Sequence, residues 1–277
     1  MKHLTITRIA ALALLLAAPL GTRAQQSEYA DLAVDALWSS ANEAYADKRF
    51  AEAAELYTRI AEMGYSSAEL YYNTGNAYFK AGQNDIALNG RPFASGQLGR
   101  AVLNYRRALR LDPSMSDAQY NLDLAVDHTN DTDGVPEFVM ARVWRSLRNM
   151  LSSNAWAALS IVLLAAVLTL TILYLLSRNV ALRKAGFFGA LLLAVLFVLA
   201  TVMAASQRSV ERRDDMAVVV CRDTAPVHSS PDNETKVIRE PGQGVTVTLS
   251  RTLGEWSEII FADGEKGWIR SAQIEKI

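Results

Sequence analysis

Three blocks of the chain are continuously apolar, and their lengths separate them into two kinds. The block at 9–20 is short and follows the basic residues Lys2 and Arg8. The blocks at 155–176 and 185–205 are longer and contain no charged residue. A helix needs about 20 apolar residues to cross a bilayer, so the pattern predicts a two-helix transmembrane hairpin over the two longer blocks. Buried core helices of a soluble domain are the alternative.

The short block is typical of a secretory signal peptide over residues 1–24. Small residues at Thr22 and Ala24 suit cleavage before Gln25, and an uncleaved anchor is the alternative. If the N-terminus is exported, two crossings return the C-terminal region to the same side, with the loop 177–184 in the cytoplasm. The prediction is a multi-pass protein of the bacterial inner membrane, with both large domains in the periplasm.

The segment 135–153, just before the first span, has apolar residues at helical spacing. Arg142, Arg145 and Arg148 are interleaved with them, and Trp144 lies in the same stretch. This pattern favours an amphipathic helix in the membrane interface, with its arginines at lipid phosphates. A plain helical extension of the upstream domain is the alternative.

Residues 25–134 contain a helical pattern that repeats. Asn42 aligns with Asn76 at a spacing of 34 residues, but the second halves of the two copies align only if about 14 residues are removed. The extra stretch, 84–97, contains glycine and proline, which break helices, so it is predicted to be a loop. A third start at 120–125 lacks its second half and indicates a capping helix.

These features resemble tetratricopeptide repeats (TPR) over residues 35–126. The resemblance rests on the period, on Gly75, and on the run of Ala101, Tyr105 and Ala108 that ends at Pro113. Ala41 stands where the family usually has glycine. The resemblance implies stacked helix pairs that bind peptides or proteins on a concave face, on or near which Asn42, Asn73 and Asn76 would lie. Ordinary polar positions on a helix surface are the alternative for Asn42 and Asn76.

Residues 216–277 change to short runs rich in branched and aromatic side chains, separated by turn residues. The predicted strands are 217–220, 245–249, 256–261 and 266–270, and Asp263-Gly264 between the last two is a strong hairpin signal. About five short strands in roughly sixty residues predict a small barrel.

This segment resembles the bacterial SH3-like (SH3b) domain, most specifically in the run Gly267-Trp268-Ile269. It departs from the family before the first turn, where Val227-His228-Ser229-Ser230 replaces the usual arginine-serine pair. The resemblance implies binding of peptidoglycan stem peptides or of proteins, with Trp256 and Trp268 as a candidate contact surface. Packing in the barrel core is the alternative for both tryptophans.

Composition excludes several classes of function. The net charge is −1, from 28 basic and 29 acidic residues, so no overall basic field recruits nucleic acid. The chain has one cysteine, Cys221, and three scattered histidines, which do not form a metal-binding pattern. Since no motif combines a nucleophile, a base and a means of stabilising charge, the prediction is a protein that is not an enzyme and has no cofactor.

The order of the modules is similar to the BatE-type proteins of the Bacteroides aerotolerance operon family. The expected fold is multidomain: an all-α TPR repeat, a two-helix transmembrane hairpin and an all-β SH3-like small barrel. The resemblance implies a periplasm-facing adaptor in a stress-related envelope complex, with von Willebrand A-domain membrane proteins, a MoxR-type ATPase and membrane lipid as partners. The alternative function is peptidoglycan binding through the SH3b domain.

Overall fold

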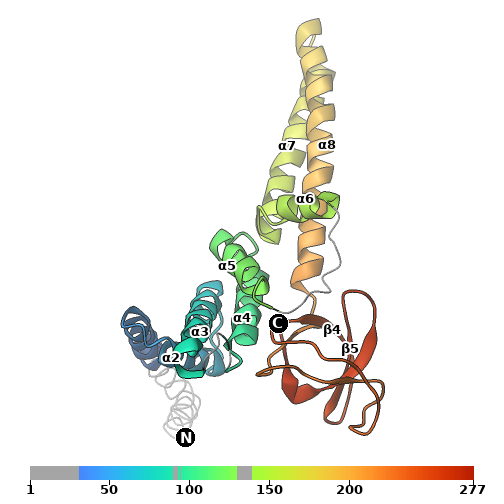
Figure 1. Cartoon of the computed structure of the whole chain (residues 1–277). Coiled ribbons are helices and arrows are strands. Elements are labelled where there is room, and N and C mark those ends of the chain that lie inside the picture. The colour runs from blue at the N-terminus through green and yellow to red at the C-terminus, as the bar shows by residue number, and fades with distance from the viewer. Residues whose placement is uncertain (1–30, 90–92, 94, 130–138) are drawn as a thin grey trace, which may run out of the picture. The chain divides into compact units, whose positions relative to one another are not determined.

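The computed structural model describes residues 31–89, 93, 95–129 and 139–277 (Figure 1). The predicted signal peptide at 1–24 lies outside these residues. The chain divides into two compact units, Met1–Ser66 and Ser67–Ile277.

The first unit is a pair of helices, one over residues 31–46 and the other α2, Phe50–Glu62. A three-residue connection joins them, and Lys48 in it has a positive φ of 62°. The side chains buried between the helices are alanines and larger apolar groups, namely Ala41, Ala44, Ala53, Ala54, Tyr57 and Ile60. Alanines at the contact let the helix axes approach, as a stacked helix pair requires.

Three further helices open the second unit: α3 is Ala68–Asn89, α4 is Gln97–Leu111 and α5 is Ser116–Val126. In space α3 packs on α4, and α4 on α5. A Cβ atom at Gly75 would lie 2.7 Å from the ring of Tyr105, so α3 and α4 can approach this closely only with glycine at that position. The close crossing expected at Gly75 from the sequence is therefore present.

The insert between the second pair of helices differs from the loop that the sequence predicted. Its first six residues, 84–89, continue α3 as helix. The physical reason is that the breaking residues come later, since the first glycine of the insert is Gly90. Helix breakers therefore set where the helix ends, whereas the repeat alignment shows only how many residues are extra.

The described part of the insert folds back on α3. The N–H of Phe93 donates to the carbonyl of Gly82 at 2.7 Å, and the Phe93 ring contacts Phe79 and His128 edge to face or tilted. Asp85 accepts hydrogen bonds from both the backbone N–H and the hydroxyl of Ser95. These contacts hold the insert against the helix from which it leaves.

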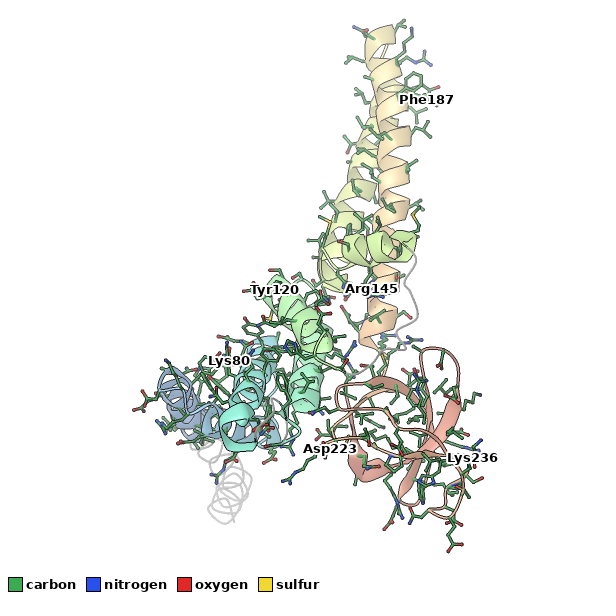
Figure 2. The ribbon with its side chains drawn as sticks, viewed as in Figure 1. Lys80, Tyr120, Arg145, Phe187, Asp223 and Lys236 are labelled. Atoms are coloured by element: carbon green, nitrogen blue, oxygen red, sulfur yellow. The ribbon has the colours of Figure 1, made fainter. Side chains whose placement is uncertain are left out.

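Three helices with exposed apolar faces follow: α6 is Val139–Arg148, α7 is Ser153–Leu176 and α8 is Val180–Glu211. Both α7 and α8 are long and apolar enough to cross a membrane, and they lie side by side (Figure 1). Their large apolar side chains, Phe187 among them, stand out from the helix pair (Figure 2). Exposed apolar patches of this kind mark surfaces that a membrane or a partner protein covers.

The connection between α7 and α8 is shorter than the predicted loop. Since α8 already begins at Val180, Arg183 and Lys184 lie in its first turns and only residues 177–179 connect the helices. The Asn179 side chain accepts from the N–H of Ala181, which caps the helix start.

The C-terminal region is a seven-stranded antiparallel sheet with the order β3-β2-β6-β5-β4-β1-β7. The strands are β1 Met216–Val219, β2 Val227–His228, β3 Val237–Arg239, β4 Thr246–Leu253, β5 Trp256–Ile260, β6 Lys266–Arg270 and β7 Ile274–Lys276. The sheet is open, with β3 and β7 at its edges, so the closed SH3-like barrel expected from the sequence is not confirmed. The sequence prediction had not resolved the short strands β2, β3 and β7.

One face of the sheet carries a compact apolar core. Its members alternate along the strands, as side chains of one sheet face must, and they are Ala217, Val219, Ala225, Val227, Val245, Val247, Ile259, Phe261, Ile269 and Ile274. Cys221 packs against this core, and burial raises the pKa of its thiol. The cysteine therefore behaves as a small apolar residue.

The sheet is joined to α4 within the second unit. Gln243 caps the start of α4: its Oε1 accepts from the N–H groups of Leu98 and Gly99, and its Nε2 donates to the carbonyl of Phe93 at 2.8 Å. At the other end of α4, Arg107 donates to the carbonyl of Lys276 in β7. One side of α4 is thus occupied by the sheet.

Candidate partner-binding surfaces

The two repeat asparagines make the same internal hydrogen bond. In the first unit, the Tyr57 hydroxyl donates to Asn42 Oδ1 at 2.5 Å. In the second unit, the Tyr105 hydroxyl donates to Asn76 Oδ1 at 2.8 Å. Each asparagine lies on the first helix of its pair and each tyrosine on the second, so the bond ties the two helices together.

The spacing of these bonds supports the alignment of the two copies. Tyr57 follows Asn42 by 15 residues, and Tyr105 follows Asn76 by 29. The difference of 14 equals the proposed length of the insert. The insert therefore adds residues between the two bonded positions and keeps the Asn–Tyr hydrogen bond.

A third helix joins the network around Asn76. The Asn121 side chain on α5 donates to Asn76 Oδ1 at 2.8 Å and to the Tyr72 hydroxyl at 3.4 Å. Asn121 was not among the residues expected from the sequence. Its alignment with the repeat start near Asn73 was the signal that would have indicated it.

Asn73 differs from Asn42 and Asn76. It is half-buried on α3, and its side chain has no hydrogen bond to another residue that the structure describes. The oxygens of Asn42 and Asn76 already accept internal bonds, which leaves their amide nitrogens for another molecule. Asn73 therefore has the greatest freedom to contact a partner among the three asparagines expected from the sequence.

A second surface lies on the face of the sheet opposite the apolar core. Trp256 and Trp268 are 8% and 7% exposed, yet they alternate with the core residues Ile259 and Ile269 along β5 and β6, so they point to the other face. The strand register places Trp268 opposite both Glu258 on β5 and His228 on β2.

Arginines cover both tryptophan rings. The Arg270 guanidinium lies 4.4 Å from the Trp256 ring centre, and that of Arg251 lies 5.0 Å from the Trp268 ring centre. Such cation–π contacts place a planar cation over an indole face. Sequence reasoning did not identify these arginines, although Arg270 follows Trp268 by two residues on β6 and so lies on the same face of the sheet.

Carboxylates beside the arginines balance part of their charge. Arg270 pairs with Glu255 and Arg251 pairs with Glu258. The pKa of Glu258 is lowered, mainly by a hydrogen bond from Ser250 and then by Arg251. The surface combines indole rings with guanidinium groups that are paired with carboxylates.

Within the residues described, no group of three or more histidine, cysteine, aspartate and glutamate side chains is placed to hold a metal ion.

Part of the helical region matches a known protein family. Residues 39–88 match the tetratricopeptide repeat family. The match covers α2 and most of α3, and a comparison with curated proteins finds none that matches the chain. The TPR match ends before α4, where the insert displaces the second half of the repeat from the usual spacing. Tetratricopeptide repeats are scaffolds for protein–protein interaction, and the family is typically not catalytic.

Proposed function

We propose that the protein is a membrane-anchored, non-enzymatic adaptor that binds other proteins through its TPR region. The observation that carries this proposal is the TPR match over residues 39–88, together with the helix pairs that the structure shows there. The two apolar helices α7 and α8 supply the membrane anchor. A TPR region joined to a membrane anchor holds the proteins that it binds close to the membrane surface.

The finer proposal places the protein in a bacterial inner membrane with both large regions in the periplasm. The layout that resembles BatE-type proteins supports this assignment, as does the apolar segment 9–20 behind Lys2 and Arg8. On this proposal the partners are von Willebrand A-domain membrane proteins and a MoxR-type ATPase, in an aerotolerance or stress-related envelope complex.

The test is a cross-linked pull-down of the tagged full-length protein from membranes in mild detergent, read by mass spectrometry. We expect von Willebrand A-domain proteins or the ATPase to be recovered, and to be lost when residues 35–126 are deleted. Recovery that persists after this deletion would show that the TPR region does not carry the binding.

Asn73 provides a sharper test of the binding surface. Replacing Asn73 with arginine adds a large charged group to α3 without breaking an internal hydrogen bond. We expect it to reduce partner recovery about tenfold or more, because a buried mismatched charge costs at least ~1.4 kcal/mol at an interface. The measurement is quantitative mass spectrometry of the pull-down.

The matched control for this substitution is Ala51→Arg on α2. Ala51 is exposed on the second helix of the first pair, which the TPR resemblance places away from the concave face. The Ala51→Arg substitution adds the same side chain outside the expected binding surface, so partner recovery should stay at the wild-type level. Equal loss in both variants would mean that added charge, and not the Asn73 surface, is responsible.

A second candidate function is peptidoglycan binding through the sheet. The observation that favours it is the pairing of Trp256 with Arg270 and of Trp268 with Arg251 on one sheet face. Stem peptides carry carboxylates, which arginines bind well, and indole rings offer apolar area beside them.

Sedimentation with purified sacculi tests this second function. We expect full-length protein in detergent to pellet with sacculi, and the double variant R251A/R270A to remain mostly in the supernatant. Arg59→Ala, at an exposed arginine of α2, should pellet like the wild type. If wild-type protein stays in solution, the wall-binding function is excluded and only the adaptor remains.

A further inference from the structure

The outer face of α5 carries apolar side chains that are exposed. Tyr120 and Leu124 are 70% and 37% exposed, and they lie one turn apart on the same side of the helix. Tyr120 stands out from α5 (Figure 2). The opposite side of α5 is buried through Ala118, Leu122 and Ala125. Because the helix that ends a repeat array usually turns a polar face outward, α5 differs from an ordinary capping helix.

The alignment of the repeats shows which kind of element would cover this face. Residues 120–125 on α5 align with residues 72–77 on α3 at a spacing of 48. In the α3–α4 pair, Tyr105 is the side chain of the second helix that packs on this stretch of the first helix. The residues of α3 that lie against Tyr105 are Tyr72, Gly75 and Asn76.

The equivalent positions on α5 are all exposed. They are Tyr120, Asp123 and Leu124, and they form the side of α5 that corresponds to the α4-facing side of α3. The exposed face is therefore the one that the second helix of a third repeat would occupy. Since the third repeat lacks its second half in the sequence, a helix from another molecule can take that place.

The charges on this face indicate which helix would fit. Asp123 and Asp127 lie beside the two apolar side chains and are exposed, and the sequence of α5 contains no basic residue. Both aspartates are at the C-terminal end of α5, where the helix dipole makes a negative charge unfavourable, so helix stability does not account for them. Anionic lipid headgroups would repel these carboxylates, whereas lysine or arginine on a docked helix would attract them.

We propose that the outer face of α5 binds a basic amphipathic helix of a partner protein. Its apolar side chains would pack on Tyr120 and Leu124, and its lysine or arginine side chains would lie beside Asp123 and Asp127. A docked amphipathic helix places such anchors three or four residues apart, which matches the spacing on α5. The inference rests on the adaptor function proposed above and names the chemistry of the bound segment, at a surface that does not include Asn73.

Site-specific photo-crosslinking of full-length protein in detergent tests this surface. Tyr120→p-benzoylphenylalanine places a photoreactive ring on the exposed face. The probe is a biotinylated amphipathic helical peptide of leucine and lysine, and the control peptide has glutamate in place of each lysine. We expect the lysine peptide to give about tenfold more adduct at residue 120, because like charges repel across a docking surface. Equal yields from the two peptides would overturn the proposed charge preference.

Reversing the charge of the protein assigns the preference to α5. In the double variant D123K/D127K the glutamate peptide should give the higher yield. The control E55K/E62K reverses two exposed carboxylates on α2 and should keep the wild-type preference. Lysine near the C-terminal end of a helix is favourable, so α5 should remain folded in D123K/D127K, which hydrogen exchange of α5 checks. An unchanged peptide preference in D123K/D127K would overturn the site.

The same photoreactive variant identifies the natural occupant in membranes. We expect the adduct, sequenced by mass spectrometry, to contain a basic amphipathic helix of another protein and to be lost in D123K/D127K. An adduct to lipid, or to α6 of a second copy, would overturn the assignment to a partner protein. If partner recovery in the pull-down depends on residues 35–126 but no adduct forms at residue 120, the adaptor function stands and only this site fails. The two failures are therefore distinguishable.

Discussion

Replacing Tyr105 with alanine should destabilise the α3–α4 pair by about 3–5 kcal/mol. Tyr105 is fully buried on α4 and packs against Gly75, and its hydroxyl donates a hydrogen bond to Asn76. Alanine would leave a cavity, remove the hydrogen bond and leave the acceptor on Asn76 with only the bond from Asn121. Hydrogen exchange of full-length protein in detergent, followed in α3 and α4, measures the effect.

The control is Tyr105→Phe, which keeps the ring and removes only the hydroxyl. It should cost about 1 kcal/mol, the usual contribution of one hydrogen bond. If the two variants lose similar amounts of protection, the hydrogen bond and not the ring packing holds the pair together. If neither changes exchange, the assignment of Tyr105 to the contact between the helices is wrong.

The second large effect is expected at the contact between α4 and the sheet. A Cβ atom at Gly99 would lie 2.6 Å from the carbonyl oxygen of Val219 and 3.2 Å from the Cα atom of Val220. Both neighbours are backbone atoms, which cannot move aside as a flexible side chain can. Gly99→Val should therefore separate α4 from β1 at a cost of about 1–3 kcal/mol.

Hydrogen exchange also measures whether α4 separates from β1 in the Gly99→Val variant. The N–H groups of Leu98 and Gly99 are bonded to Gln243, so their protection should fall in the Gly99→Val variant while protection inside β5 and β6 is kept. Lys80→Val places the same side chain on an exposed site of α3 and should change neither region. Unchanged protection at the start of α4 would mean that the sheet does not dock there.

The helices were predictable from the sequence because their signal is local. The spacing of Ala53, Tyr57 and Ile60 sets the buried face of α2, and uninterrupted apolar runs identify α7 and α8. The aligned positions of Asn42 and Asn76 were likewise found from the period. Their hydrogen bonds to Tyr57 and Tyr105 were not predicted, because the period shows which positions are equivalent but not which side chains form hydrogen bonds with each other.

The contacts that were missed join residues far apart in the chain. Gln243 lies 144 residues from Gly99, and no pattern within either segment indicates that one caps the other. The openness of the sheet is a similar case, because alternation along a strand shows which face is buried but not whether the edges β3 and β7 meet.

The end of α8 limits how far the sheet can stand from a membrane. The apolar run ends at Ala205, α8 continues to Glu211, and only residues 212–215 separate it from β1. Six helical residues add about 9 Å, and four extended residues add at most about 15 Å. On the membrane assignment proposed above, β1 begins less than about 25 Å from the bilayer core. To reach the sheet, a ligand attached to the cell wall would have to come this close to the membrane. Another membrane protein would already lie at that distance from the sheet.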